Sequence, residues 1–196
     1  MRRFLQSMVC FLCISAMCAS ISADDKSKDQ KSYANKNFDF CIHFPANWTS
    51  SESYSRNGAT LAPSNAKAFS LPPRISVGAR VDQPSQTGNG PQTLDENIQS
   101  SIDSLREYGS ALDIQVLKKD AITIQRLPAR AITLKYRDSH SEDEWFVKDV
   151  NLIDHQNTVY FAELKCHPKD AIALESIFDA LVQSLRLQCR SRTRTE

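Results

Sequence analysis

The sequence contains little glycine and carries no excess of either charge. Its five glycines are scattered through 196 residues, so no glycine-rich loop is present to bind phosphate groups. Lysine and arginine total 24 against 23 aspartate and glutamate residues, and this balance provides no general basic surface for nucleic acid. We therefore expect no phosphate-binding glycine loop and no nucleic-acid partner.

Catalytic motifs are also missing. The sequence has no Gly-x-Ser-x-Gly and no His-Glu-x-x-His, and its Cys-x-x-Cys occurs only between Cys10 and Cys13, inside an apolar run. Its four histidines are isolated from one another in the sequence, and a lone histidine is usually structural or solvated. We expect no catalytic residues and no cofactor, and an enzyme of unknown type is the least favoured function.

The N-terminus has the layout of a secretory signal. Arg2 and Arg3 precede a mostly apolar run, residues 4–21, and the small residue Ala23 stands before Asp24. This pattern predicts a signal peptide over residues 1–23 and a periplasmic or secreted protein, with an uncleaved membrane anchor as the alternative. No second long apolar run follows, so we expect no membrane span after signal removal.

The rest of the chain has the length of one domain. Residues 24–36 are rich in lysine, aspartate and serine, which predicts a flexible lead-in. Residues 37–188 form the expected single domain. Residues 189–196, with three arginines and one acid, are expected to be a disordered basic tail. We expect a monomer.

The second half of the sequence predicts a strand meander and then a helix. Residues 131–137 alternate apolar and polar side chains, and residues 145–153 and 159–164 are rich in aromatic and β-branched residues. Pro168 can start a helix over residues 168–187. The apolar stripe of this helix is Leu174, Ile177, Phe178, Leu181 and Leu185.

The first half predicts further strands and one helix. Thr93 and Glu96 form a capping box for a helix that ends at Gly109. Strands are expected over residues 38–45, 59–63, 75–81, 112–116 and 121–125, with a turn at residues 118–120. This order predicts an α+β fold in which an antiparallel sheet of about six strands is flanked by helices.

One end of the meander gathers possible metal ligands. His140, Glu142, Asp143 and His167 are the candidates, with Glu144 and Cys166 nearby. Zinc accepts such side chains, but their spacing matches no compact zinc motif. An acidic, solvated hairpin is the favoured interpretation, so we expect no metal site.

Three cysteines remain after the signal: Cys41, Cys166 and Cys189. The last helix separates Cys166 from Cys189 by about 30 Å, whereas the Cα atoms of a disulfide lie within about 7 Å. We favour a Cys41–Cys189 disulfide, which would anchor the end of the chain to its first strand. A Cys41–Cys166 disulfide and three free thiols remain open.

The segment Phe40-Cys-Ile-His-Phe-Pro-Ala-Asn-Trp48 resembles the opening of the PsbP-like group, which includes the DcrB-like bacterial envelope proteins and the Mog-type Ran-binding proteins. Ser184-Leu-Arg186 is similar to the Ser-Phe-Arg ending of this group. The resemblance implies an α/β/α sandwich around the antiparallel sheet, and an accessory or adaptor role. It carries over no functional residues, because the group shares packing residues rather than a site.

The main functional hypothesis is an exported, non-catalytic accessory or binding protein of the bacterial cell envelope. Its partner would be an unidentified envelope protein, bound through residues 82–91 and the sheet face that the last helix leaves uncovered. The alternative is a periplasmic carrier of a small apolar ligand. That function requires a cavity lined by Ile75, Val77, Ile132 and Leu134.

Overall fold

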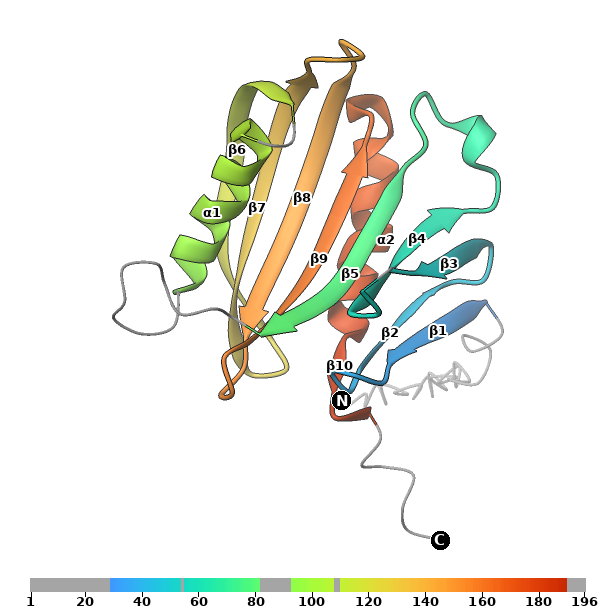
Figure 1. Ribbon diagram of the computed structural model, residues 1–196. Helices are drawn as coiled ribbons and strands as arrows, with labels where there is room; N and C mark the ends of the chain where they lie inside the picture. The colour runs from blue at the N-terminus through green and yellow to red at the C-terminus, as the bar shows by residue number, and fades with distance from the viewer. Residues whose placement is uncertain (1–28, 54, 82–92, 108–109, 190–196) are drawn as a thin grey trace, which may run out of the picture.

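The computed structural model describes residues 29–53, 55–81, 93–107 and 110–189 (Figure 1). The first half contains β1 (Gln30–Asn35), β2 (Phe40–Pro45), β3 (Trp48–Glu52), β4 (Gly58–Pro63), the short 3-10 helix η2 (Ala66–Ala68), β5 (Arg74–Val81) and α1 (Leu94–Glu107). The second half contains β6 (Ala111–Ile124), β7 (Leu127–Asp138), β8 (Glu144–Ile153), β9 (Thr158–Cys166), the 3-10 helix η3 (Pro168–Asp170), α2 (Ala171–Ser184) and β10 (Arg186–Leu187).

The strands form two antiparallel sheets. The larger sheet has seven strands in the order β3-β4-β5-β9-β8-β7-β6, and the smaller has three in the order β1-β2-β10. Helices α1 and α2 lie on opposite faces of the larger sheet (Figure 1). The predicted α+β sandwich is confirmed. The strands outnumber the expected six, because the larger sheet alone has seven and three more form the small sheet beside α2. Within the described ranges, neither helix is long and apolar enough to cross a membrane.

Helix α1 begins at the predicted capping box. The backbone N–H of Glu96 donates to Thr93 Oγ1 at 3.2 Å, and the backbone N–H of Thr93 donates to Glu96 Oε2 at 2.6 Å. Two backbone donors at the helix start are thereby satisfied. The buried residues Ile98 and Ile102 hold the helix against the sheet. The predicted stop at Gly109 lies outside the described residues.

Helix α2 covers the other face with the predicted stripe. Leu174, Phe178 and Leu181 are buried and pack against the larger sheet and β2. The helix ends at Ser184, earlier than predicted, because the chain then extends to pair as β10 with the edge of β2. Ser184 ties the end of the helix to β2, since its Oγ accepts the backbone N–H of His43 at 2.8 Å.

Two parts of the small sheet differ from prediction. Residues 30–35 pair with β2 as strand β1, so the predicted lead-in is wrong for these residues, and residues 24–28 lie outside the described chain. The buried side chain of Asn35 stabilises the turn between β1 and β2, because its Oδ1 accepts the backbone N–H groups of Asn37 and Phe38. Cys189, placed in the predicted tail, is part of the folded domain.

Strand β6 is longer than predicted. The expected turn at residues 118–120 is wrong, because β6 pairs with β7 continuously on both sides of it, with register shifts between Leu112 and Gln115 and between Val116 and Lys118. As an edge strand, β6 can keep polar side chains in solvent and absorb irregularities that also protect the edge. β3 is a further strand that the sequence analysis does not predict, and its first residue, Trp48, is buried in the core.

Candidate functional site

The candidate metal ligands of the β7–β8 hairpin make separate contacts. The His140 ring hydrogen-bonds Ser110 Oγ at 2.7 Å. Glu142 forms an ion pair with Arg137. The backbone N–H of Asp143 lies 3.4 Å from Ser141 Oγ. These contacts are those of an exposed, solvated hairpin.

The remaining candidates lie after β9. His167 Nδ1 accepts the backbone N–H of Lys169 at 3.1 Å and caps η3. Cys166 is fully buried, and burial raises the pKa of its thiol to about 12, so it is not a reactive thiolate. Among the described residues, no three His, Cys, Asp or Glu side chains lie close enough together to hold a metal ion.

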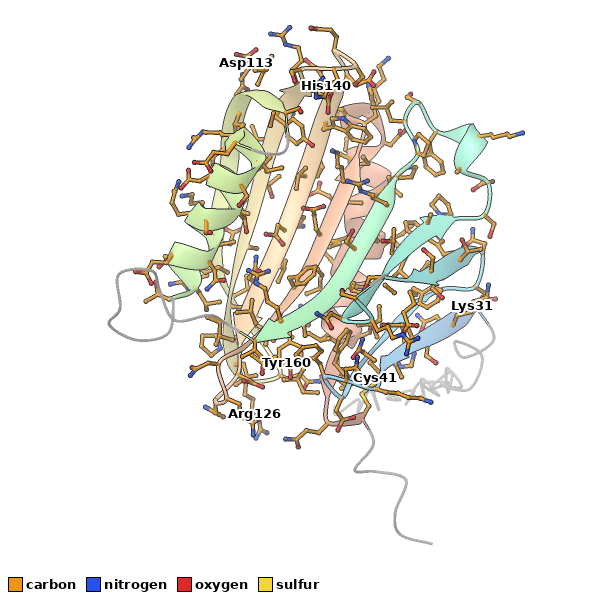
Figure 2. All side chains as sticks on the ribbon, in the orientation of Figure 1. Lys31, Cys41, Asp113, Arg126, His140 and Tyr160 are labelled. Carbon is orange, nitrogen blue, oxygen red and sulfur yellow. A yellow bond between two sulfur atoms is a disulfide. The ribbon has the colours of Figure 1, made fainter. Side chains whose placement is uncertain are left out.

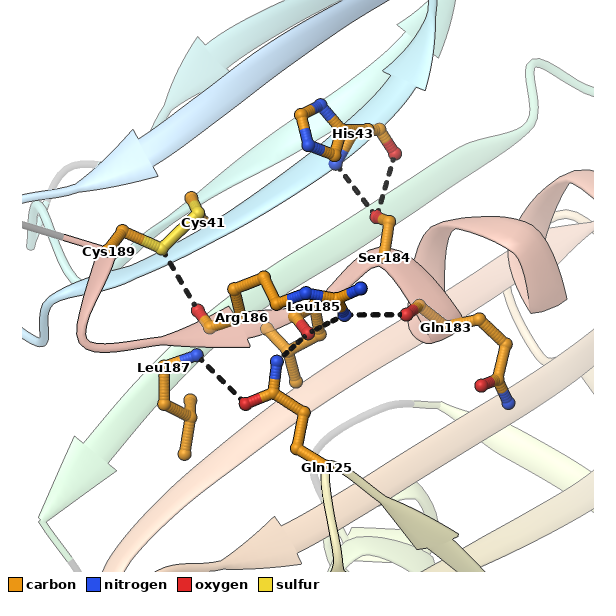
Figure 3. The surroundings of a disulfide bond; sticks show 9 residues. All are labelled: Cys41, His43, Gln125, Gln183, Ser184, Leu185, Arg186, Leu187 and Cys189. Carbon is orange, nitrogen blue, oxygen red and sulfur yellow. Dashed lines mark hydrogen bonds between the residues drawn. A yellow bond between two sulfur atoms is a disulfide. The ribbon is translucent and has the colours of Figure 1, made fainter. Parts of the chain in front are cut away.

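The favoured disulfide is present. Cys41 of β2 and Cys189 are bonded, with their Cα atoms 6.1 Å apart (Figure 3). Cys166 is the free cysteine of the described chain. The bond fastens the residues after β10 to β2 and closes a loop across almost the whole domain.

The interior does not support an apolar carrier. Ile75 and Val77 face α2, whereas Ile132 and Leu134 belong to the cluster under α1, so the four side chains cannot line one cavity. The apolar cavity between α2 and the larger sheet measures about 20 Å³. A space of this size holds about one water molecule. The predicted ligand cavity is therefore wrong.

Helix α1 covers only one half of its sheet face. It contacts β6, β7 and β8, and no helix lies over β9 and β5 in Figure 1. We call the uncovered part the open face. The strand registers and contacts place on it Ser76, Arg80, Asp149, Asn151, Phe161, Glu163 and Lys165.

A pair of carboxylates forms the centre of the open face. Asp149 of β8 stands directly opposite Glu163 of β9 in the antiparallel register. Asp149 is only 8% exposed, and its Oδ2 accepts the side-chain N–H of Asn151 at 2.8 Å. Burial, and then the charge of Glu163, raise the pKa of Asp149 to about 7. Near neutral pH, Asp149 therefore gains or loses a proton readily.

Arg80 lies beside this pair without forming an ion pair with it. Its Nη2 donates to Asn97 Oδ1 of α1 at 3.0 Å, and its guanidinium lies 5.7 Å from the ring centre of Phe161. Gly78 makes room for that ring, because a Cβ there would lie 2.7 Å from a Phe161 atom. Within the described chain, the carboxylate of Glu163 makes no hydrogen bond or ion pair.

Lys165 is similarly turned onto aromatic rings. Its Nζ lies 4.3 Å from the ring centre of Trp145 and 5.0 Å from that of Tyr136. Burial, and then the nearby Arg74, lower the pKa of Lys165, while burial raises the pKa of Tyr136 to about 12. Arg80 and Lys165 are thus held by rings and an amide, and none of the described cations forms an ion pair with Asp149 or Glu163.

The sequence carries a signal for this site in the strand over residues 145–153. By the period of two, Trp145, Val147 and Ile153 share one face, and Asp149 and Asn151 fall on the same face. A carboxylate and an amide in the middle of an otherwise apolar strand face indicate a buried polar site.

Comparisons with known proteins identify the fold. No family model matches the sequence, and no curated protein matches it. Among solved structures, the cyanobacterial PsbP protein CyanoP from Synechocystis sp. PCC 6803 superposes with a TM-score of 0.60 at 8% identity, over 81% of this chain and 92% of that one. The chain has a PsbP-like fold. The predicted resemblance is therefore confirmed at the level of the fold.

Two further structures share this PsbP-like fold. The Saccharomyces cerevisiae Ran-binding protein Mog1p has a TM-score of 0.58 at 10% identity, over 83% of this chain and 97% of that one. LpqN, involved in cell envelope biogenesis of Mycobacterium tuberculosis, has a TM-score of 0.56 at 12% identity, over 80% and 88%. Identities this low show a common fold and assign no activity.

Proposed function

We propose that the protein is an exported, non-catalytic accessory protein of the bacterial cell envelope that binds a partner protein through the open face. Remote neighbours support a binding role, since one is a Ran-binding protein and another takes part in cell envelope biogenesis. The Cys41–Cys189 disulfide supports export, because such bonds persist in oxidising compartments.

The observation that carries this proposal is the unpaired state of the carboxylates on the open face. Glu163 is half-buried beside the buried Asp149 of the adjacent strand, and neither carboxylate forms an ion pair within the described chain, while Arg80 and Lys165 contact rings. Arginine and aromatic side chains are enriched at protein interfaces, and unpaired charges provide electrostatic complementarity. The open face therefore offers a partner both apolar contact and an acidic centre.

The raised pKa of Asp149 is also a property of catalytic acids and bases. An active site would additionally need a nucleophile, a metal or an oxyanion-stabilising group near it. In the described part of the chain, the groups around Asp149 are Asn151, Glu163 and Arg80, and no metal-ligand cluster accompanies them. Binding is the function that these groups support best.

Site-specific crosslinking tests the proposal. A photo-reactive residue replaces Ser76 on the open face of a chain that starts at Asp24, and a matched one replaces the exposed Ala173 on α2. In envelope extracts we expect a specific crosslinked protein from position 76 and none from position 173. The charge reversal Arg80→Glu should suppress that crosslink. The same crosslink from position 173, or one insensitive to Arg80→Glu, would refute binding through the open face.

A further inference from the structure

A polar cleft lies at the end of the molecule that holds the disulfide. It runs between the β6–β7 turn and the C-terminal strand, and its volume is about 950 Å³. Figure 2 labels Arg126 and Cys41 at this end of the molecule. The lining of this cleft includes two arginines, three glutamines and no carboxylate, namely Arg126, Arg186, Gln125, Gln183 and Gln188.

The walls of this polar cleft are fixed to one another. The side chain of Gln125 donates to the backbone carbonyl of Leu185 and accepts the backbone N–H of Leu187 at 3.3 Å, which joins the turn to β10 (Figure 3). The Cys41–Cys189 disulfide holds the opposite wall. A site held in this way loses little conformational entropy when a ligand binds.

The turn that presents Arg126 is built from unfavourable residues. Gln125 and Arg126 have φ angles of 50° and 69°, the left-handed conformation that a two-residue hairpin requires and that Asn-Gly adopts most easily. Gln125 is explained by its two hydrogen bonds to β10. Arg126 has no such structural role, because its side chain makes no hydrogen bond or ion pair within the described chain.

Arg186 adds a second, better-fixed guanidinium. Its Nη1 donates to the backbone carbonyls of Gln183 at 3.0 Å and Leu185 at 2.8 Å. No carboxylate of the described residues forms an ion pair with either arginine. Two cationic groups without counter-charges therefore border a cleft whose other polar groups are neutral amides.

We propose that this cleft binds an acidic saccharide, a ligand that combines hydroxyl groups with a carboxylate or a phosphate. Guanidinium groups pair bidentately with both anions. The amide of Gln183, whose side chain makes no hydrogen bond within the described residues, offers a donor and an acceptor of the kind that hydroxyls require. The volume lies in the range of small-ligand sites. This site is separate from the open face and does not depend on the function proposed for it.

Isothermal titration of the disulfide-intact chain tests the proposal. The probes are trigalacturonic acid for the carboxylate form, glucose 6-phosphate for the phosphate form, and neutral maltotriose. We expect one of the two acidic saccharides to bind, which identifies the anion, and maltotriose to bind at least about tenfold more weakly. Arg126→Gln should weaken the acidic ligand about tenfold or more, and Arg126→Lys by less, because it keeps the charge and loses the bidentate geometry.

Matched controls separate the cleft from general charge effects. Lys67→Gln removes the same charge from the exposed helix η2 and should leave affinity unchanged. The triple change Arg190→Gln, Arg192→Gln and Arg194→Gln should also leave it unchanged. Three outcomes would overturn the proposal. In the first, neither acidic saccharide binds. In the others, Arg126→Gln binds as tightly as the unchanged chain, or only the triple variant loses binding. Equally tight binding of triglutamate would also overturn it, because that probe lacks hydroxyls.

Discussion

The two faces of the larger sheet differ in what they bury. The face under α2 carries an apolar cluster that draws on all seven strands, and Phe178, Leu181 and the side chains of β2 cover it. The face under α1 has a smaller apolar cluster around Ile98 and Ile102, and beside it lies the polar open face. The face under α2 supplies most of the apolar burial that stabilises the fold. The face under α1 keeps buried polar groups that reduce this stability.

This difference suggests how the fold tolerates a buried carboxyl group. Charged Asp149 is disfavoured where it lies, because it is desolvated and faces Glu163. Asn151 and Arg80 offset only part of that cost. A buried carboxyl group that lowers stability is usually retained because it has a function. The apolar face under α2 supplies the stability that compensates for it.

The largest expected effect comes from cutting the same side chain on each face. Leu181→Ala on α2 should lower the free energy of unfolding by about 2–5 kcal/mol, because Leu181 is buried and its surroundings can close only part of the cavity that the change leaves. Leu105→Ala on α1 should cost less, since Leu105 is only partly buried at the edge of its cluster. Urea denaturation of the two variants gives both values. Equal losses would mean that the two faces contribute alike to stability.

The next effect concerns pH and the carboxyl group of Asp149. Its pKa is about 7 in the folded protein against an ordinary value of 3.8, so the folded state binds more protons between these values. Stability should therefore fall as pH rises from about 4 to 7, by up to about 4 kcal/mol, and level off above 7. Asp149→Asn, which can still accept the hydrogen bond from Asn151, should remove most of that slope.

Glu107→Gln is the matched control for this measurement. It makes the same change from acid to amide at an exposed position of α1 and should leave the slope unchanged. Thermal melts between pH 4 and 8 provide the comparison. A slope that survives in Asp149→Asn would assign the pH dependence to other groups.

Much of the sandwich was predictable because its signals are local. The alternation of residues 131–137, the stripe of Leu174 and Phe178, and the capping box of Thr93 and Glu96 each depend on neighbours within one element. The length of α2 excludes the pair Cys166 and Cys189 on geometric grounds, but the choice of Cys189 rather than Cys166 as the partner of Cys41 depends on the pairing of β10 with β2.

The open face and the small sheet depend on contacts between distant segments. Asp149 and Glu163 become neighbours only in the register that β8 and β9 adopt, and the sequence of either strand alone does not determine that register. β1 is polar and gains its order from β2 and from Asn35. The cleft at Arg126 likewise arises where a hairpin turn meets β10, which lies about 60 residues away along the chain.

The smallest expected effect concerns the ion pairs of Lys148 at the edge of the face under α2. Lys148 of β8 points into that face with 17% of its side chain exposed, and its Nζ lies 2.8 Å from Asp179 and 3.4 Å from Glu175. Glu175→Ala should cost well under about 1 kcal/mol, because Lys148 keeps Asp179 and the remaining pair is partly solvated. The double variant Glu175→Ala and Asp179→Ala should cost more than the sum of the single changes, since it leaves a half-buried ammonium without a carboxylate. A double-mutant cycle in urea measures this coupling. Additive losses would show that solvent, rather than the two carboxylates, balances Lys148 at the margin of the apolar face.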